Sequence, residues 1–363
     1  MEPQNLLRNN STHISLGLGA IETTLHNKIN LYKKRAKDVE DYLSKKPDEW
    51  GRFQQEFNSE INNIFRDIMM YEKRNLTKGN IEKVYKLKKI FINKLRKLFV
   101  RKDYWEWSIK RPLGYAGDYK IIDAIYQNNP QTTGFDRLFD NYFMMCAISV
   151  GVRNRKEDFK KIISTFVNKR RKKQIRIMNL ACGPCRDVQE LLLTNMVSNK
   201  NVIFDCYDSD ERALKYAKDL LKTFLNINFL KENALRLAAT KHINSKIKKR
   251  YDIIYAMGLF DYLNDNISTK LIKNLRALLK IEGILMISSV RDKYSNPDAH
   301  YMEWTGDWNL VYRDDDEFRK LFIDAGFIID ELKLQCEQQG IMQYIIATNS
   351  HEINSERQPN EFK

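Results

Sequence analysis

The fold is decided by the stretch Asn179-Leu180-Ala181-Cys182-Gly183-Pro184-Cys185-Arg186-Asp187. A run of β-branched and apolar residues over 175–181 predicts a buried strand before the turn, and the pattern over 186–196 predicts a helix after it. Small residues in a turn between a strand and a helix let a ligand approach the backbone closely. The sequence therefore predicts a strand–turn–helix unit whose turn is a candidate binding site.

The same alternation continues toward the end of the chain. Further strands are predicted over 202–207, 227–231, 251–257 and 283–290, and helices over 211–224, 267–280 and 314–325. Strands that alternate with helices form right-handed crossovers, and hence a parallel sheet with helices on both faces. The last two strands, 327–334 and 341–348, leave no room for a helix and predict an antiparallel hairpin at the sheet edge. We therefore predict an α/β fold with a Rossmann-like, seven-stranded sheet.

The chain before this sheet is mostly helical in pattern. Ile81, Val84, Leu87 and Phe91 recur at steps of three and four, which predicts a helix with one apolar stripe. One Pro and two Gly within 110–119 predict a shaped loop. We predict three parts: a helical N-terminal or lid domain over 1–165, the sheet domain over 166–350 and a polar tail over 351–363.

The composition excludes several classes of protein. Of 363 residues, 43% are hydrophobic and only 7 are Pro, which excludes a wholly disordered or Pro-rich chain. The longest apolar run, 142–152, is too short to span a bilayer, and no signal-peptide core follows the polar start. Five Cys do not form a disulfide framework in a chain of this length. We expect a cytoplasmic protein.

The chain is strongly basic, with a formal net charge of +15. Residues 1–101 hold 21 Lys and Arg against 12 Asp and Glu, so the predicted helical domain carries much of the excess. A basic face suits an acidic acyl carrier protein, an anionic membrane surface or nucleic acid. It also suits a solvated, Lys-rich surface with no partner. The charge alone therefore selects no partner, and the oligomeric state stays open.

Polar side chains follow the next strands of the predicted sheet. Asp208 ends the second strand, 25 residues after Gly183, and Asn233 follows the third. The carboxyl ends of the strands form the binding edge of an open α/β sheet. A carboxylate there suits the two hydroxyls of a ribose, and an amide suits the edge of an adenine. The sequence therefore predicts a nucleoside site along this edge. The segment 255–262, at the end of the fourth strand, belongs to the same edge.

In order and spacing, these pieces resemble class I S-adenosylmethionine-dependent methyltransferases over about residues 165–350. The resemblance implies S-adenosylmethionine as cofactor, and cofactor contacts from Asn179, Ala181, Gly183, Pro184, Asp208, Ser209, Asn233, Ala234, Met257 and Gly258. The turn departs from the family pattern, because Asn179, Ala181 and Cys185 stand where an acid and two glycines are usual. The alternative for such a sheet is an NAD site, but its G-x-G-x-x-G pattern is absent.

A narrower resemblance extends outside the sheet. Its motifs are Arg111-Pro112-Leu113-Gly114-Tyr115-Ala116-Gly117-Asp118-Tyr119, Val152-Arg153-Asn154-Arg155, Cys182-Gly183-Pro184-Cys185-Arg186 and Glu303-Trp304-x-x-Asp307-Trp308-x-Leu310-x-Tyr312-Arg313. They are similar to bacterial proteins for the biosynthesis of an extracellular factor, 3-hydroxypalmitic acid methyl ester. This resemblance implies a small-molecule acceptor and carboxyl O-methylation of a fatty or hydroxy-fatty acyl group.

Residues in these motifs and in the loops after the fourth and fifth predicted strands are candidates for the transfer itself. The catalytic candidates are Tyr115, Asp261 and His300, and those for cofactor contact outside the sheet are Tyr115, Asp118 and Arg153. The substrate-binding candidates are Tyr119, Tyr262, Arg291, Trp304, Trp308, Tyr312 and Arg313. A carboxylate acceptor is ionised at neutral pH and needs no base, whereas a hydroxyl or amine acceptor needs one such as His300.

Each candidate also has a structural alternative. Asp118 is suited to capping a helix, His300 and Arg153 to ordinary structural or surface positions, and the aromatic residues to a core. The pair Cys182-x-x-Cys185 has no second pair to complete a zinc site, so we expect small residues lining the turn and no metal. Two further hypotheses remain: an RNA or protein methyltransferase that uses the basic face, and a non-catalytic S-adenosylmethionine-binding regulatory module with an altered turn.

Overall fold

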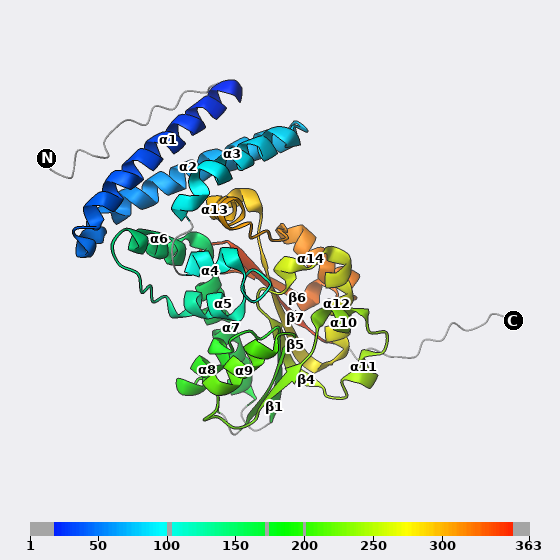
Figure 1. Cartoon of the computed structure of the whole chain (residues 1–363). Coiled ribbons are helices and arrows are strands. Elements are labelled where there is room, and N and C mark those ends of the chain that lie inside the picture. Colours follow the sequence, from blue (N-terminus) through cyan, green and yellow to red (C-terminus); the bar gives the residue numbers. More distant parts are fainter. Residues whose placement is uncertain (1–17, 100–103, 171–173, 199–200, 351–363) are drawn as a thin grey trace. The chain divides into compact units, whose positions relative to one another are not determined.

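The computed structural model describes residues 18–99, 104–170, 174–198 and 201–350. The chain forms two compact units (Figure 1). The helical unit consists of Met1–Val150 and Asp292–Asn309, and the sheet unit of Gly151–Arg291 and Leu310–Lys363. The predicted tail over 351–363 lies outside the described residues.

The sheet unit contains the predicted seven-stranded sheet, in the order β3-β2-β1-β4-β5-β7-β6. Its strands are β1 (Ile175–Leu180), β2 (Val202–Asp208), β3 (Ile227–Lys231), β4 (Tyr251–Ala256), β5 (Leu279–Val290), β6 (Leu332–Cys336) and β7 (Met342–Thr348). The first five are parallel, and β7 runs antiparallel to both β5 and β6. The predicted fold class and the terminal antiparallel hairpin are therefore confirmed. The order reverses between β1 and β4, which is where an open α/β sheet opens its ligand crevice.

Three predicted helices of the sheet unit end three or four residues early, at Leu193, Leu220 and Ala277, and two predicted strands were wrong in their bounds. The strand predicted from 283 begins at Leu279, which pairs with Tyr251 across an irregularity in the ladder. The polar residues before Gly283 resemble a loop in sequence, so only the pairing with β4 shows that they belong to the strand. The strand predicted over 327–334 is instead β6, preceded by the 3-10 turn η5 (Ile329–Glu331).

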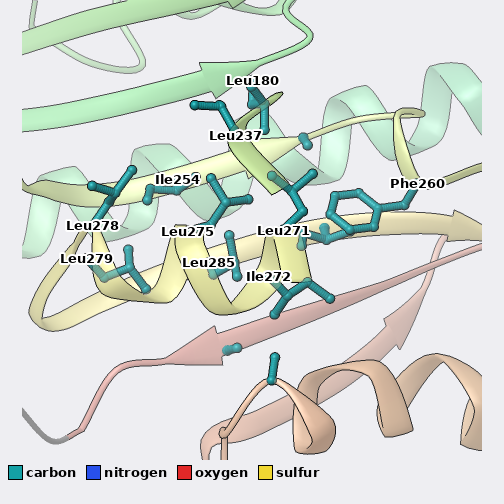
Figure 2. Close-up of a cluster of buried hydrophobic side chains, with 14 of the residues drawn as sticks. Leu180, Leu237, Ile254, Phe260, Leu271, Ile272, Leu275, Leu278, Leu279 and Leu285 are labelled. Carbon is teal, nitrogen blue, oxygen red and sulfur yellow. The ribbon is translucent and has the colours of Figure 1, made fainter. Parts of the chain in front are cut away.

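Helices cover both faces of the sheet. They are α7 (Ala147–Lys169), α8 (Arg186–Leu193), α9 (Glu211–Leu220), α10 (Ala234–Ala239), α11 (Ile243–Lys246), α12 (Asp265–Ala277) and α14 (Asp315–Asp324), with the 3-10 turn η3 (Phe260–Tyr262) after β4. Met178 and Leu180 of β1 belong to one apolar cluster, with α10, α12 and α14. Figure 2 shows Leu180 in this cluster together with Leu237 of α10 and Leu271 and Leu275 of α12. Ile175 and Ile177 belong to the other, with α7, α8 and α9. Alternate residues of a strand face opposite sides, so the two clusters are the two faces of the sheet.

The division of the chain differs from the boundary expected at 165. Phe159, Ile163 and Val167 of α7 are buried in the second apolar cluster, so most of this helix belongs to the sheet unit. The segment Asp292–Asn309, between β5 and α14, belongs to the helical unit instead. A helical pattern in sequence does not show which unit a helix packs against.

The helical unit is built on three long helices, α1 (Leu18–Leu43), α2 (Gly51–Thr77) and α3 (Ile81–Phe99). It also contains α4 (Tyr104–Lys110), α5 (Tyr119–Gln127), α6 (Gly134–Met145), α13 (Pro297–Gly306) and the 3-10 turns η2 (Pro47–Trp50) and η4 (Lys293–Ser295). Val84, Leu87 and Phe91 are buried as the stripe on α3 predicts, whereas Ile81 is 49% exposed. Within the described residues, no helix has both the length and the apolar character needed to cross a bilayer.

Candidate functional site

The turn after β1 is held in an unusual backbone conformation. Ala181, Gly183 and Cys185 all have φ near 53°, in the left-handed region that favours glycine. The two residues that replace glycine therefore keep a glycine-like backbone, at a conformational cost of about 1–2 kcal/mol each. No atom lies within 4 Å of where a side chain on Gly183 would begin. The turn therefore leaves open space above Gly183, where a ligand can approach the backbone.

Asn179 lies next to this turn, in the last part of β1. Its side chain is 2% exposed, and its amide Nδ2 has no hydrogen-bond partner among the described residues. A buried polar group without a partner is costly and is rare in folded proteins. The amide is therefore an unpaired hydrogen-bond donor near the carboxyl end of β1.

Asp208 joins the end of β2 to the turn. Its Oδ2 accepts a hydrogen bond from the Gly183 N–H at 2.9 Å, and its Oδ1 accepts one from the Asp210 N–H at 2.9 Å. Burial raises the pKa of Asp208, and the backbone N–H groups of Asp210, Gly183 and Ser209 oppose the rise. A carboxylate has about four lone-pair sites, so capacity for a further donor remains. The structure brings Asp208 and Gly183 together as the sequence predicts, and Ser209 beside them is exposed.

Asn233 is the N-cap of α10, so part of its hydrogen-bonding capacity is already taken by the helix. Its Oδ1 accepts from the N–H groups of Leu235 at 2.8 Å and Arg236 at 3.4 Å. These bonds occupy the amide oxygen, which is the atom of Asn233 that could accept from an adenine amino group. The amide N–H groups remain as donors, beside Ala234, which is half-buried.

The segment after β4 combines an exposed and a buried candidate. Tyr262 is 47% exposed, whereas Asp261 is 4% exposed and accepts from the Val290 N–H at 2.7 Å through Oδ1. Burial raises the pKa of Asp261, while Arg155 and Val290 lower it. Met257 and Gly258 are half-buried at the end of the strand.

Arg155 lies near this segment and belongs to the motif 152–155, from which Arg153 and not Arg155 was predicted to contact the cofactor. It lies on α7, is 2% exposed, and donates from Nη1 to Ser288 Oγ at 3.2 Å. Arg153, the expected cation two residues earlier, is only half-buried. One signal was available: Arg155 precedes the core residue Phe159 by four positions, which places both on the same face of a helix.

Two arginines expected to bind substrate are used inside the sheet unit. Arg313 donates to Asp265 Oδ1 at 2.9 Å and to the Phe260 carbonyl at 2.9 Å, so it fixes the segment after β4. Arg291 donates to both carboxylate oxygens of Asp315, at 2.9 and 3.2 Å. Tyr312 is half-buried in the same unit. The contacts of both arginines indicate a structural role, which sequence alone does not reveal.

In the helical unit, the structural alternative describes Asp118 well. Its Oδ1 accepts from the N–H groups of Lys120 and Ile121 at the start of α5, and its Oδ2 accepts from Trp107 Nε1 at 2.8 Å. Tyr119 is buried, and Tyr115 is 39% exposed. Asp118 is therefore the N-cap of α5, and any cofactor contact of this loop stays a prediction.

His300, Trp304 and Trp308 lie in the core of the helical unit. His300 is fully buried, with Nε2 at 3.4 Å from Glu72 Oε1, and Trp304 Nε1 donates to Glu72 Oε2 at 3.1 Å. Trp308 stacks on Trp105, with ring centroids 6.4 Å apart. These contacts match the core alternative for the two tryptophans. The role of His300 as a base stays a prediction.

Three buried cysteines pack together under the turn. Cys206 of β2 contacts both Cys182 and Cys185 through its thiol. No group of His, Cys, Asp or Glu suited to hold a metal ion occurs in the part of the chain that the structure describes. The cysteines therefore act as small apolar residues that pack beneath the turn.

Comparison with known proteins agrees with this arrangement. Residues 171–346 match a family model described as Methyltransferase domain. No curated protein matches the chain. Among solved structures, the chain is similar to a possible exported protein from Bordetella parapertussis, with 17% identity, a TM-score of 0.53 and coverage of 64% of this chain and 80% of that chain. At this identity, the similarity shows a shared fold alone.

Two weaker structural similarities carry no argument of their own. One is to magnesium protoporphyrin IX methyltransferase from Synechocystis with bound S-adenosylmethionine, with 12% identity, a TM-score of 0.43 and coverage of 69% of this chain and 99% of that chain. The other is to the N-methyltransferase NodS from Bradyrhizobium japonicum with S-adenosylhomocysteine, with 15% identity, a TM-score of 0.38 and coverage of 55% and 88%.

S-adenosylmethionine is the cofactor of this type of domain, and the strand ends fit it. The Asn179 amide has no partner among the described residues, the space over Gly183 is open, and Asp208 has capacity for a further donor. The sheet order and the match of residues 171–346 to the Methyltransferase domain model give this segment the α/β fold of methyltransferases.

Proposed function

We propose that this chain transfers a methyl group from S-adenosylmethionine to a small molecule and forms the carboxyl methyl ester of a fatty or hydroxy-fatty acid. One observation supports the methyltransferase part of the proposal. The Asp208 carboxylate accepts a hydrogen bond from the Gly183 N–H in the turn after β1, and open space lies over Gly183. The acceptor part is supported by the resemblance of the motifs around Tyr115, Arg155 and Trp304 to proteins of fatty-ester biosynthesis.

Residues from three strand ends would hold the cofactor. When bound, S-adenosylmethionine supplies a methyl group on a positively charged sulfur. Asp208 keeps lone-pair capacity for the ribose, and the Asn233 amide donates to the adenine. Asn179 offers its unpaired amide to the amino-acid end. Each of these roles uses hydrogen-bonding capacity that the protein itself leaves unused.

The surroundings of Asp261 and His300, two candidate bases, support a carboxylic acid as the acceptor. A carboxylic acid has a pKa near about 4, so at neutral pH it arrives already ionised. Asp261 is buried, with one oxygen bonded to Val290, and His300 lies beside Glu72 in the helical unit. An acceptor that needs no deprotonation suits these surroundings better than a hydroxyl or an amine does.

RNA is the second candidate acceptor, because the chain carries a net charge of +15. Lys83, Lys86 and Lys89 are exposed along α3. The same basic face is a candidate docking surface for an acidic acyl carrier protein or an anionic membrane. Binding to RNA through such a face weakens steeply with added salt.

The test combines labelled cofactor with candidate acceptors. Purified protein is mixed with S-adenosylmethionine carrying a labelled methyl group, a series of long-chain acids and total RNA. The expected result is label in an organic-extractable methyl ester that alkaline hydrolysis releases as methanol, and much less label with the Asp208→Ala variant at a cofactor concentration that does not saturate it. Label found only in RNA would overturn the fatty-acid proposal. Failure of the wild-type protein to bind S-adenosylhomocysteine would overturn the transferase proposal as well.

A further inference from the structure

Arg155 is a buried cation in the sheet unit. It lies on α7, on the same face as the core residues Phe159 and Ile163, and is only 2% exposed. A guanidinium taken out of water without close partners is strongly unfavourable, so buried arginines are normally surrounded by acceptors. The partners of Arg155 therefore indicate whether it serves packing or a ligand.

The protein satisfies only one end of this guanidinium. Nη1 donates to Ser288 Oγ at 3.2 Å and lies 3.9 Å from Met342 Sδ. The carboxylate within ion-pair range is that of Asp261, whose Oδ2 is 3.8 Å from Nη1, beyond hydrogen-bond distance. Asp261 also uses Oδ1 for the Val290 N–H. The charge of Arg155 is therefore attracted to Asp261 but not hydrogen-bonded to it.

The other edge of the guanidinium is unused. Nε is buried and has no hydrogen-bond partner, and among the described residues none accepts from Nη2. The Nε–H and Nη2–H bonds of an arginine are parallel and match the two oxygens of a carboxylate. This free edge is therefore shaped for a bidentate, planar anion.

The free edge lies at the strand ends. A side chain on Gly258, directly after β4, would begin 3.3 Å from Arg155 Nη2, and Gly258 has φ +85°. The Gly258 N–H donates to Ser288 Oγ at 3.3 Å, so Arg155 and Gly258 share one partner on β5. Glycine at this position leaves Nη2 uncovered. The carboxyl ends of β4 and β5 are the edge where an open α/β sheet binds its ligand.

We propose that the Nε–Nη2 edge of Arg155 binds a carboxylate at the carboxyl ends of β4 and β5. This inference rests on the proposed function, which offers two sources of that group: the acceptor acid, or the amino-acid end of S-adenosylmethionine. In either case Arg155 positions its ligand with two parallel hydrogen bonds, and Ser288 fixes the orientation of the guanidinium.

The experiment compares Arg155→Met and Arg155→Lys with Lys161→Met, which removes an exposed cation from the same helix. Calorimetry measures binding of S-adenosylhomocysteine, of methylthioadenosine, which lacks the amino-acid end, and of hexadecanoate to protein saturated with methylthioadenosine. If the cofactor supplies the carboxylate, Arg155→Met weakens S-adenosylhomocysteine at least tenfold and leaves methylthioadenosine unchanged. If the acceptor supplies it, only hexadecanoate binding falls at least tenfold. Lys161→Met changes none of them.

Two outcomes overturn the Arg155 site. One is an Arg155→Met protein that binds S-adenosylhomocysteine and hexadecanoate as tightly as the wild-type protein does. A wild-type protein that does not bind hexadecanoate, combined with unchanged S-adenosylhomocysteine affinity in the variant, counts as the same outcome. The other is an equal loss for S-adenosylhomocysteine and methylthioadenosine, which marks a structural role. If Arg155→Met does not fold, Arg155→Lys decides, because an ammonium keeps the charge but not the two parallel donors, and a tenfold loss is still expected. Wild-type protein that binds no S-adenosylhomocysteine rejects the proposed function instead.

Discussion

Replacing Asp208 with alanine should weaken binding of the nucleoside part of the cofactor. The carboxylate accepts from the N–H groups of Gly183 and Asp210 and keeps lone-pair capacity for a further donor. A hydrogen bond to a charged group contributes about 1.5–3 kcal/mol. Loss of one such bond to a ribose hydroxyl weakens binding at least about tenfold.

The assay is calorimetric titration of S-adenosylhomocysteine into wild-type and Asp208→Ala protein. The matched control is Asp210→Ala, which removes the side-chain cap of α9 but keeps the backbone N–H that Asp208 holds. The control should lose about 1 kcal/mol of stability and no affinity. Wild-type affinity in Asp208→Ala would refute the assignment of this carboxylate to the ribose. Equal losses in both variants would show that the turn, and not the contact, was damaged.

Three further changes test other parts of the structure. Ala181→Gly should raise the free energy of unfolding by about 0.5–1 kcal/mol in urea titrations. Glycine removes the strain of the left-handed backbone in the folded state, and the greater backbone entropy of glycine in the unfolded chain cancels part of this gain. Asp187, buried under a hydrogen bond from Tyr255, has its pKa raised to about 6, mainly by burial. Between about pH 4 and 6 the folded protein keeps a proton on Asp187 that the unfolded chain has lost, so wild-type stability falls as the pH rises through this range. Asp187→Asn should therefore be more stable than the wild-type protein by roughly 2–3 kcal/mol at pH 7 but not at pH 4. Gly306→Ala should destabilise the helical unit by about 1–3 kcal/mol, because the new methyl group would begin 2.7 Å from the ring of Trp105.

Each of these three has a result that contradicts it. A lower unfolding midpoint in Ala181→Gly would mean that the turn is not strained. A stability difference between Asp187→Asn and wild-type protein that is the same at pH 4 and pH 7 would show that Asp187 does not titrate as described. An unchanged thermal midpoint in Gly306→Ala would show that the Trp105 ring moves aside without cost.

The sequence by itself determined the class of sheet and the residues at its binding edge. Alternating strands and helices allow few arrangements, and the carboxyl ends of parallel strands meet at one edge, so the pattern alone assigns Gly183, Asp208 and Asn233 to that edge. The close approach of Asp208 to the Gly183 N–H confirms part of that placement. Ala181 and Cys185 keep the backbone of the glycines they replace, which the sequence did not reveal.

The tertiary structure alone decided which charged side chains are free and which are used. Arg313 and Arg291 look like ligand-binding cations in sequence, but carbonyls and carboxylates of the sheet unit hold them. Arg155 resembles its neighbour Arg153 in sequence, yet its helix turns it inward with one edge unpaired. The segment Asp292–Asn309 belongs to the helical unit although β5 and α14 of the sheet unit flank it. The physical reason is the same in each case: local pattern fixes the element, whereas burial and pairing depend on groups from distant parts of the chain.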